Sequence, residues 1–167
     1  AISARTAHLI GMENFANAEG AIIELVKNAY DADADTCVVV ADIREDNVKS
    51  KLFIIDNGSG MTDEIIIKHW MTIGTDDKLL NARSSNKKRV KSGAKGIGRF
   101  ALNRLGTSAE MLSFASNEFG KGYVWNVDWK KFDKARVLSD VEANLEEITI
   151  DYLASKLNEY GINRLPI

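Results

Sequence analysis

One segment, Glu24-Leu25-Val26-Lys27-Asn28-Ala29-Tyr30-Asp31-Ala32, combines the apolar spacing of a helix with polar residues on one side. Apolar residues recur at three- and four-residue steps through this region, which predicts a helix over residues 17–32. Glu24 and Asn28 are four residues apart, so their side chains project from one face, and Asp31 lies near it. An amide oxygen suits Mg²⁺, and a carboxylate one turn earlier could orient or deprotonate an attacking water. Taken alone, the same pattern also describes the solvated side of an amphipathic helix.

A second segment, Asp56-Asn57-Gly58-Ser59-Gly60-Met61, follows an apolar strand predicted over residues 51–56. An ionised carboxylate at the end of a buried strand needs a partner, and the exocyclic amine of adenine is a suitable donor. Gly58 and Gly60 lack a Cβ and would let the main chain approach a flat base, on which Met61 could pack. Taken alone, Asp-Asn-Gly is also an ordinary turn.

A third segment, Gly93-Ala94-Lys95-Gly96-Ile97-Gly98, leads into a helix predicted over residues 96–105. Free main-chain amides and the helix dipole at such a start attract phosphate, and Lys95 adds a positive charge. The segment is not a P-loop, because the chain has no Gly-x-x-x-x-Gly-Lys-Ser/Thr string. It is a poor dinucleotide fingerprint as well, because a long polar loop over residues 73–92 precedes it instead of a strand.

The rest of the chain predicts alternating strands and helices. A helix is predicted over residues 63–71, with Thr62 as its cap and acidic residues in its first turn. Periodicity and turn residues predict further strands over 37–43, 109–116 and 123–127, and a helix over 152–160.

Composition describes an ordinary globular protein. The chain has 167 residues, 45% hydrophobic and 28% charged, which fits a single domain with a real core. Its net charge of −2 gives no global basic field for nucleic acid, and no apolar run is long enough to span a bilayer. The single cysteine, Cys37, cannot form an internal disulfide, which suits a reducing cytoplasm, and its apolar surroundings predict a buried small hydrophobe.

In this order, the three segments resemble the motifs of the GHKL ATPases, the family of DNA gyrase B, heat-shock protein 90, histidine kinases and MutL. Glu24-x-x-x-Asn28-Ala29-x-Asp31-Ala32 is similar to the first motif, Asp56-x-Gly58-x-Gly60-Met61 to the second, and Gly93-x-x-Gly96-x-Gly98 to the third. The segment Ile73-Gly74-Thr75-Asp76-Asp77-Lys78 resembles the stretch before the lid in MutL-like and MORC-like members.

The resemblance implies an α+β fold, a two-layer α/β sandwich of the Bergerat type with a mixed β-sheet and helices on one face. It implies Glu24 as general base, Asn28 as the Mg²⁺ ligand and Asp56 as the adenine reader. The cofactor-binding residues that it implies are Asn28, Asp31, Asp56, Gly58, Gly60, Met61, Lys78, Gly93, Ala94, Lys95, Gly96, Ile97 and Gly98.

The function implied by the resemblance is ATP binding with slow Mg²⁺-dependent hydrolysis by a heat-shock protein 90-like or MutL-like module. A lid over residues 74–98 would close on ATP and favour homodimerisation of a longer protein. The family's fourth motif is a Gly-Thr pair, but Gly106-Thr107 is predicted to be a turn and Thr149 lacks the glycine. The chain is therefore expected to stop before that motif, as a piece spanning one domain over residues 1–167.

Two other functions stay open at this point. The first is a nucleotide sensor that binds without hydrolysis. The second is a DNA-associated clamp, whose backbone contacts would come from a basic cluster. That cluster consists of Lys87, Lys88, Arg89 and Lys91.

Overall fold

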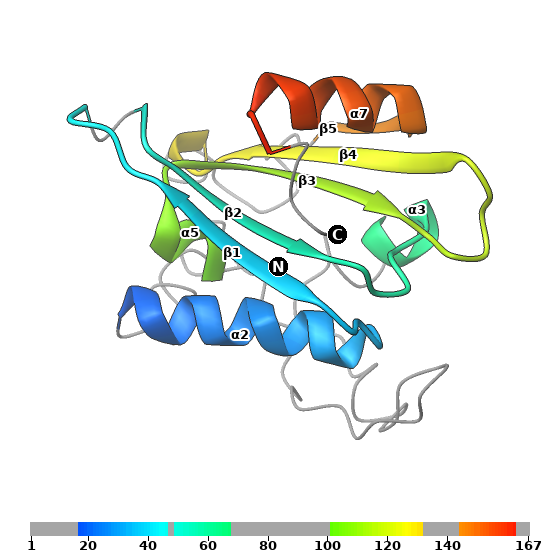
Figure 1. Ribbon diagram of the computed structural model, residues 1–167, viewed down its shortest axis with the longest axis horizontal. Helices are drawn as coiled ribbons and strands as arrows, with labels where there is room; N and C mark the ends of the chain where they lie inside the picture. The colour runs from blue at the N-terminus through cyan, green and yellow to red at the C-terminus, as the bar shows by residue number, and fades with distance from the viewer. Residues whose placement is uncertain (1–16, 47–48, 68–100, 132–143, 163–167) are drawn as a thin grey trace.

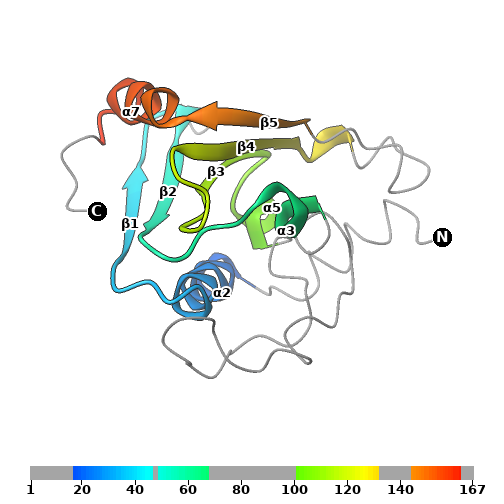
Figure 2. The same ribbon diagram turned by 90° about the vertical axis from the view of Figure 1, so that its right-hand side faces the viewer.

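Two groups of antiparallel strands separate helices that lie on opposite sides of the molecule (Figures 1 and 2). The computed structural model describes residues 17–46, 49–67, 101–131 and 144–162. Helix α7 lies on one side of the strands in both views, and helix α2 lies on the other.

The first group of strands is a hairpin. Strand β1 (Cys37–Asp42) pairs antiparallel with β2 (Lys51–Asp56), in a register that places Cys37 opposite Asp56. Alternate side chains of a strand point to opposite faces, so directly paired residues share a face. Both strands occur where the sequence predicted them, since apolar runs are bounded there by polar turns.

The second group has the order β3-β4-β5 and is also antiparallel. It consists of β3 (Ser108–Phe114), β4 (Lys121–Asp128) and β5 (Asn144–Thr149). The central strand β4 is the most deeply buried, and its buried hydrophobic residues are Tyr123, Val124, Trp125 and Val127. Strand β5 was not predicted from the sequence.

Helix α2 (Ala18–Asp31) begins where Asn17 Oδ1 accepts the N–H of Gly20 at 2.8 Å, a bond that satisfies a free helical donor. The helix contacts α5 (Ala101–Leu105) and β2. Its buried apolar residues recur every four positions and form one stripe along the helix, namely Ala21, Leu25 and Ala29. The predicted helix over 17–32 is confirmed, and its first and last residues, Asn17 and Ala32, are the N-cap and the C-cap of α2.

Two of the other predicted helices are described only in part. Helix α3 (Asp63–Ile65) starts at the predicted cap, because Thr62 Oγ1 accepts the N–H of Ile65 at 3.3 Å. Residues 68–71 of the predicted 63–71 helix, and residues 96–100 before α5, lie outside the described residues.

Helix α7 (Ile150–Glu159) lies across the strands from α2 (Figure 2). Its last turn packs on the strands through Tyr160, whose ring centroid is 5.3 Å from that of Phe53 in β2. The Tyr160 hydroxyl donates to Oε1 of Glu110 in β3 at 2.9 Å. The same side chain therefore joins α7 to both groups of strands.

The two-layer α+β class is confirmed, with two differences of detail. Every strand pairing that involves the described residues is antiparallel, whereas a mixed sheet was predicted. Helix α7 also covers the side of the strands that the prediction left without helices. Its contacts with β2 and β3 through Tyr160 join distant segments, which helical periodicity does not reveal.

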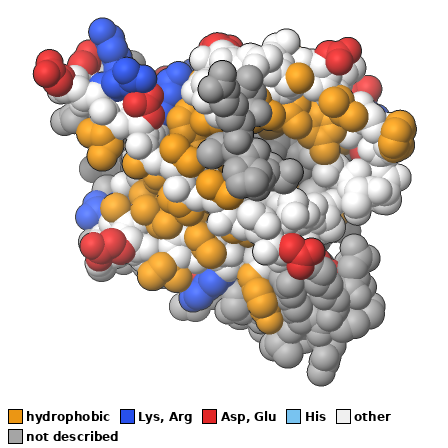
Figure 3. Space-filling model, viewed as in Figure 1, with side chains coloured by type: hydrophobic (Ala, Val, Ile, Leu, Met, Phe, Trp, Pro, Cys, Tyr) orange, Lys and Arg blue, Asp and Glu red, His pale blue; other side chains and the backbone are white. Residues whose placement is uncertain are grey.

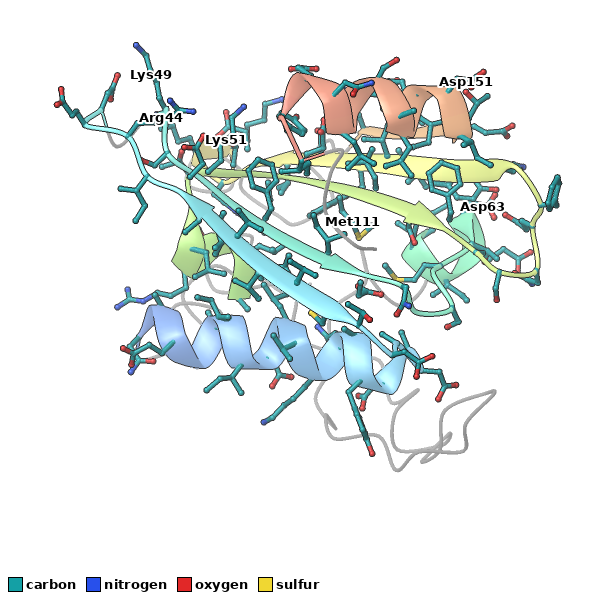
Figure 4. The ribbon with its side chains drawn as sticks, in the orientation of Figure 1. Arg44, Lys49, Lys51, Asp63, Met111 and Asp151 are labelled. Carbon is teal, nitrogen blue, oxygen red and sulfur yellow. The ribbon has the colours of Figure 1, made fainter. Side chains whose placement is uncertain are left out.

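The surface carries an apolar region and a separate charged one. Hydrophobic side chains gather over β1 and α2 on the face seen in Figure 3. The exposed ones on these two elements are Ile23, Val26, Tyr30 and Val39. Arg44, Lys49 and Lys51 lie together at the β1–β2 connection, at the far end of the molecule from Asp63 (Figure 4). Exposed apolar side chains are common on protein surfaces, so these do not by themselves indicate a binding site.

Candidate functional site

Helix α2 carries three predicted site residues beside its buried stripe. Glu24 and Asn28 are half-buried, and Asp31 in the last turn is only 8% exposed. Each of the first two is followed in sequence by a buried residue, Leu25 or Ala29. The polar side chains therefore lie at the border between the core and the surface, where they can contact a ligand while their helix is held by packing.

The end of α2 has a hydrogen-bond pattern that glycine usually completes. Asp33 N–H donates to the Tyr30 carbonyl, and Ala34 N–H donates to the Ala29 carbonyl, each at 3.1 Å, which forms a Schellman motif. Asp33 takes the left-handed conformation with φ of 65° and is buried. This conformation costs a residue with a Cβ ~1 kcal/mol. Strain of this kind clusters at functional sites and makes this turn a candidate for one.

The turn after β2 is bonded directly to the turn after α2. Asn57 Oδ1 accepts the main-chain N–H groups of Asp35 and Thr36, each at 2.9 Å. Ser59 N–H donates to the carbonyl oxygen of Ala32 at 2.7 Å. The first and second sequence segments therefore lie against each other, although more than twenty residues separate the bonded partners.

Gly58 lies against Ala32, where these turns leave no room for a side chain. A Cβ at this position would lie 2.8 Å from the Ala32 carbonyl oxygen and 2.9 Å from the Ala32 Cβ. Its N–H also donates to Asp56 Oδ1 at 2.9 Å, which orients that carboxylate. The sequence attributed this glycine to contact with a flat base, whereas the structure provides a reason within the protein itself.

Gly60 and Met61 attach the same turn to β3. Gly60 has φ of 67°, and a Cβ there would overlap the carbonyl oxygen of Phe114. Met61 N–H donates to Ser113 Oγ, and Ser116 N–H donates to the Ser59 carbonyl, both at 2.8 Å. The turn is thus held from two sides, by the end of α2 and by the end of β3.

Two interactions between titratable side chains occur in this region. Burial, and then the nearby Asp56 carboxylate, raise the pKa of the Cys37 thiol above its ordinary value. The thiol therefore stays protonated near neutral pH, as expected for an unreactive cysteine. On α2, Lys27 Nζ lies 3.9 Å from Glu24 Oε2, a contact between partly exposed groups that contributes little to stability.

The donor set on α2 fits a magnesium ion that is shared with a phosphate ligand. Among the residues that the structure describes, no group of three histidine, cysteine or acidic side chains could hold a metal alone. Mg²⁺ commonly takes only one or two protein oxygens and completes its octahedron with phosphate and water. The amide of Asn28, with the carboxylates of Glu24 and Asp31 on the same helix, suits that arrangement.

The structure brings together the ends of the first two predicted segments, and it leaves the third untested. Asp31, Asp56, Gly58, Gly60 and Met61 belong to the joined turns or to the chain ends that enter them. The predicted residues that lie outside the described ranges are Lys78, Gly93, Ala94, Lys95, Gly96, Ile97 and Gly98. The predicted basic cluster over 87–91 lies outside them as well.

Sequence reasoning missed two features of this region, the side-chain hydrogen bonds of Asn57 and the position of Cys37 opposite Asp56. Asn57 was treated as the variable position of a motif, although asparagine often accepts main-chain N–H groups in turns, and that was the available signal. The position of Cys37 opposite Asp56 depends on strand register, for which the isolated residue carries no signal. The predicted turn at Gly106-Thr107 is confirmed, since these residues connect α5 to β3.

Comparison with known proteins identifies the family of the chain. Residues 16–159 match the family described as histidine kinase-, DNA gyrase B- and HSP90-like ATPase. A search of curated proteins gave no significant match. None of the described helices has the length and apolar character needed to cross a membrane. Because the family match covers most of the sequence, the chain belongs to the histidine kinase-, DNA gyrase B- and HSP90-like ATPases and is an ATP-binding module of the GHKL kind.

Proposed function

We propose that this module binds Mg²⁺-ATP across the joined turns after α2 and β2 and hydrolyses it slowly. The observation that carries the proposal is the contact of Ala32 with Gly58 and Ser59. This contact brings together two segments that hold an amide and carboxylates on the helix side and a carboxylate on the strand side.

Asp56 would recognise the base. Its Oδ1 accepts the Gly58 N–H, so the carboxylate has a defined orientation at the end of β2. The exocyclic amine of adenine can donate to a carboxylate, whereas guanine presents a carbonyl oxygen at the same position of its ring. A charge-assisted hydrogen bond of this kind contributes ~1.5–3 kcal/mol.

Asn28 would hold the metal through its amide oxygen, with Asp31 nearby on the same helix face. When bound, Mg²⁺ would offset the negative charge of the phosphates. The role of Asn28 is to fix that charge relative to the base, because α2 is bonded to the turn that carries Asp56.

Glu24 would act as general base, one turn before Asn28. Its carboxylate would accept a proton from a water that attacks the γ-phosphorus. The new P–O bond forms as the bond to the β–γ bridging oxygen breaks, and ADP leaves with that electron pair. Lys27, at 3.9 Å, can hold the Glu24 side chain before ATP arrives.

A lid over residues 74–98 would cover the phosphates. By resemblance, phosphate contacts come from Lys78, Gly93, Ala94, Lys95, Gly96, Ile97 and Gly98, and closure of the lid would favour a homodimer. Solvent exclusion by such a lid is a common step in phosphoryl transfer.

The proposed chemistry is tested by phosphate release from the wild type and from Glu24→Ala. We expect the variant to retain affinity for Mg²⁺-ATP and to lose at least ~100-fold in turnover, since a general base contributes about that factor. A Glu24→Gln variant, which keeps size and loses basicity, should behave in the same way. Equal turnover in the wild type and both variants would remove Glu24 from the mechanism. Tight binding with no wild-type turnover would favour a non-hydrolysing sensor.

A further inference from the structure

We propose that Asn57 is a positioning residue that couples the two halves of the nucleotide site. One half is the end of α2, which carries Asn28, and the other is the end of β2, which carries Asp56. The inference rests on the proposed function, because it concerns how the two halves act together on one ligand.

The contacts of Asn57 bridge the two chain segments directly. Its Oδ1 accepts the N–H groups of Asp35 and Thr36, each at 2.9 Å, and its own N–H donates to the Thr36 carbonyl at 3.3 Å. Three hydrogen bonds therefore connect one residue after β2 with two residues before β1. They begin where the β1–β2 ladder ends, at the pair of Cys37 and Asp56.

The chain needs an acceptor at this point because of the turn that precedes β1. After the left-handed Asp33, the Ala34 N–H donates back to the helix. The two N–H groups that follow, on Asp35 and Thr36, point to a single oxygen. An amide oxygen accepts two such bonds, whereas an alanine would leave both donors to water. Asn57 thus defines the path from the last turn of α2 into β1.

Asn57 also lies between the two residues that fix the other contacts. On one side is Asp56, and on the other is Gly58, which packs on Ala32. Ala32 in turn bonds to the helix through its N–H, which donates to the Asn28 carbonyl at 3.0 Å. A short series of contacts therefore runs from the main chain of Asn28 through Ala32 and Gly58 to Asp56, and Asn57 closes it into a ring.

The consequence concerns ligands that engage both halves. The base and the phosphates of ATP are joined covalently, so both are bound well only if the two halves keep the matching separation. Adenosine engages the base half and is insensitive to that separation. Loss of Asn57 should therefore weaken Mg²⁺-ATP much more than adenosine.

The experiment measures dissociation constants by calorimetry for adenosine and for a Mg²⁺-bound, non-hydrolysable ATP analogue. For Asn57→Ala we expect the analogue to bind ~10-fold more weakly and adenosine to change less than ~3-fold, since two net hydrogen bonds are lost. Asn57→Asp retains the acceptor oxygen and should restore analogue binding to within ~3-fold of the wild type in a buffer whose salt screens the added charge. Asn144→Ala, an exposed asparagine at the start of β5, is the matched control and should change neither constant.

The outcomes separate this inference from the proposed function. Equal loss for both ligands in Asn57→Ala, or unchanged binding of both, would overturn the coupling role while wild-type binding still supports the nucleotide site. A wild type that binds neither ligand would overturn the proposed function itself. If Asn57→Ala does not fold, Asn57→Gln, whose oxygen is displaced by one carbon, should give the same split between the ligands, and an equal loss there would contradict the coupling.

Discussion

The two longest helices that the structure describes end alike, but they are attached to the strands by different means. Helix α2 ends with Asp33 at φ of 65°, and α7 ends with Gly161 at φ of 70°. Both ends have the Schellman pattern, in which the buried residue that follows, Ala34 or Ile162, donates back to the helix.

The attachments differ in which atoms make them. The turn after β2 is bonded to the end of α2, and to the end of β3, through main-chain groups together with the Asn57 and Ser113 side chains. Gly58 allows its close approach to Ala32, and Gly60 allows that to Phe114. The end of α7 is attached through a side chain, because Tyr160 packs on Phe53 and donates to Glu110. Lys51 Nζ also lies 4.4 Å from the centroid of the Tyr160 ring.

This difference indicates where the molecule needs a fixed geometry. A junction of main-chain atoms sets the separation of two segments closely, and it does so largely without using the side chains that would bind a ligand. A junction of side chains stabilises the fold but can adjust when one of them changes. The α2–β2 junction is therefore the expected binding site, and the α7 junction is expected to serve stability.

The largest expected effect comes from placing a Cβ where the turn after β2 meets the end of β3. Gly60→Ala should destabilise the protein by more than ~3 kcal/mol, since the new methyl overlaps the Phe114 carbonyl and the backbone is left-handed. Gly120→Ala is the matched control, because its φ is 75° but no atom lies within 4 Å of the added Cβ. The Gly120→Ala substitution should lower the unfolding free energy by ~1 kcal/mol, from backbone strain alone. Urea denaturation of both variants gives the comparison, and equal losses would mean that the junction can adjust.

A smaller effect is expected at the side-chain junction. Tyr160→Phe removes the hydrogen bond to Glu110 and keeps the ring contacts, so unfolding free energy should fall by ~1 kcal/mol or less. Burial, and then the bond to Glu110, raise the pKa of Tyr160. The contribution of the Tyr160 hydroxyl to the unfolding free energy of the wild type should therefore be complete below pH ~10 and be lost as the pH rises further. The variant has no hydroxyl at this position, so its unfolding free energy should lack this pH dependence.

Nucleotide affinity of the Tyr160→Phe variant tests whether the α7 junction serves stability alone. Tyr160→Phe should leave the affinity for Mg²⁺-ATP unchanged, because α7 lies across the strands from α2. A marked loss of affinity in a folded variant would contradict the division between the two junctions.

The smallest expected effect is a change in thiol reactivity. Asp56→Asn should lower the raised pKa of Cys37, because it removes the negative charge and leaves the larger contribution of burial. Alkylation at fixed pH below that pKa should then become ~2–5-fold faster, since the thiolate is the reactive form. The protein has a single cysteine, so the label reports this site alone. An unchanged rate would mean that the two side chains do not interact.

Sequence reasoning found the elements with regular patterns and missed those that depend on partners. Helix α2 and strands β1 and β2 have clear periodicity and were predicted to within a residue or two. Strand β5 was missed because Glu146 and Glu147 interrupt the alternation of apolar and polar residues that indicates a strand. One of these acidic residues is paired with the neighbouring strand β4, where Lys121 Nζ lies 3.0 Å from Glu147 Oε2.

The start of α7 shows a second kind of error. The helix was predicted from Tyr152, but it begins at Ile150, because Thr149 Oγ1 accepts the N–H of Tyr152 and caps it. Thr149 had been considered only as a motif residue, so its capping role was overlooked. For the candidate site, the motif residues were read from the sequence, and their role in binding stays a prediction. The contacts of Asn57, Ala32 and Phe114 with that site could not, since they join distant segments.

The central claim is that the joined turns after α2 and β2 bind the adenine of ATP through Asp56. Calorimetric titration of a Mg²⁺-bound, non-hydrolysable ATP analogue into the wild type and Asp56→Asn tests it most directly. The asparagine can still accept the Gly58 N–H but presents an amide in place of a carboxylate. The account predicts saturable binding to the wild type and ~10–100-fold weaker binding to the variant. Equal affinities, with both proteins folded, would contradict it.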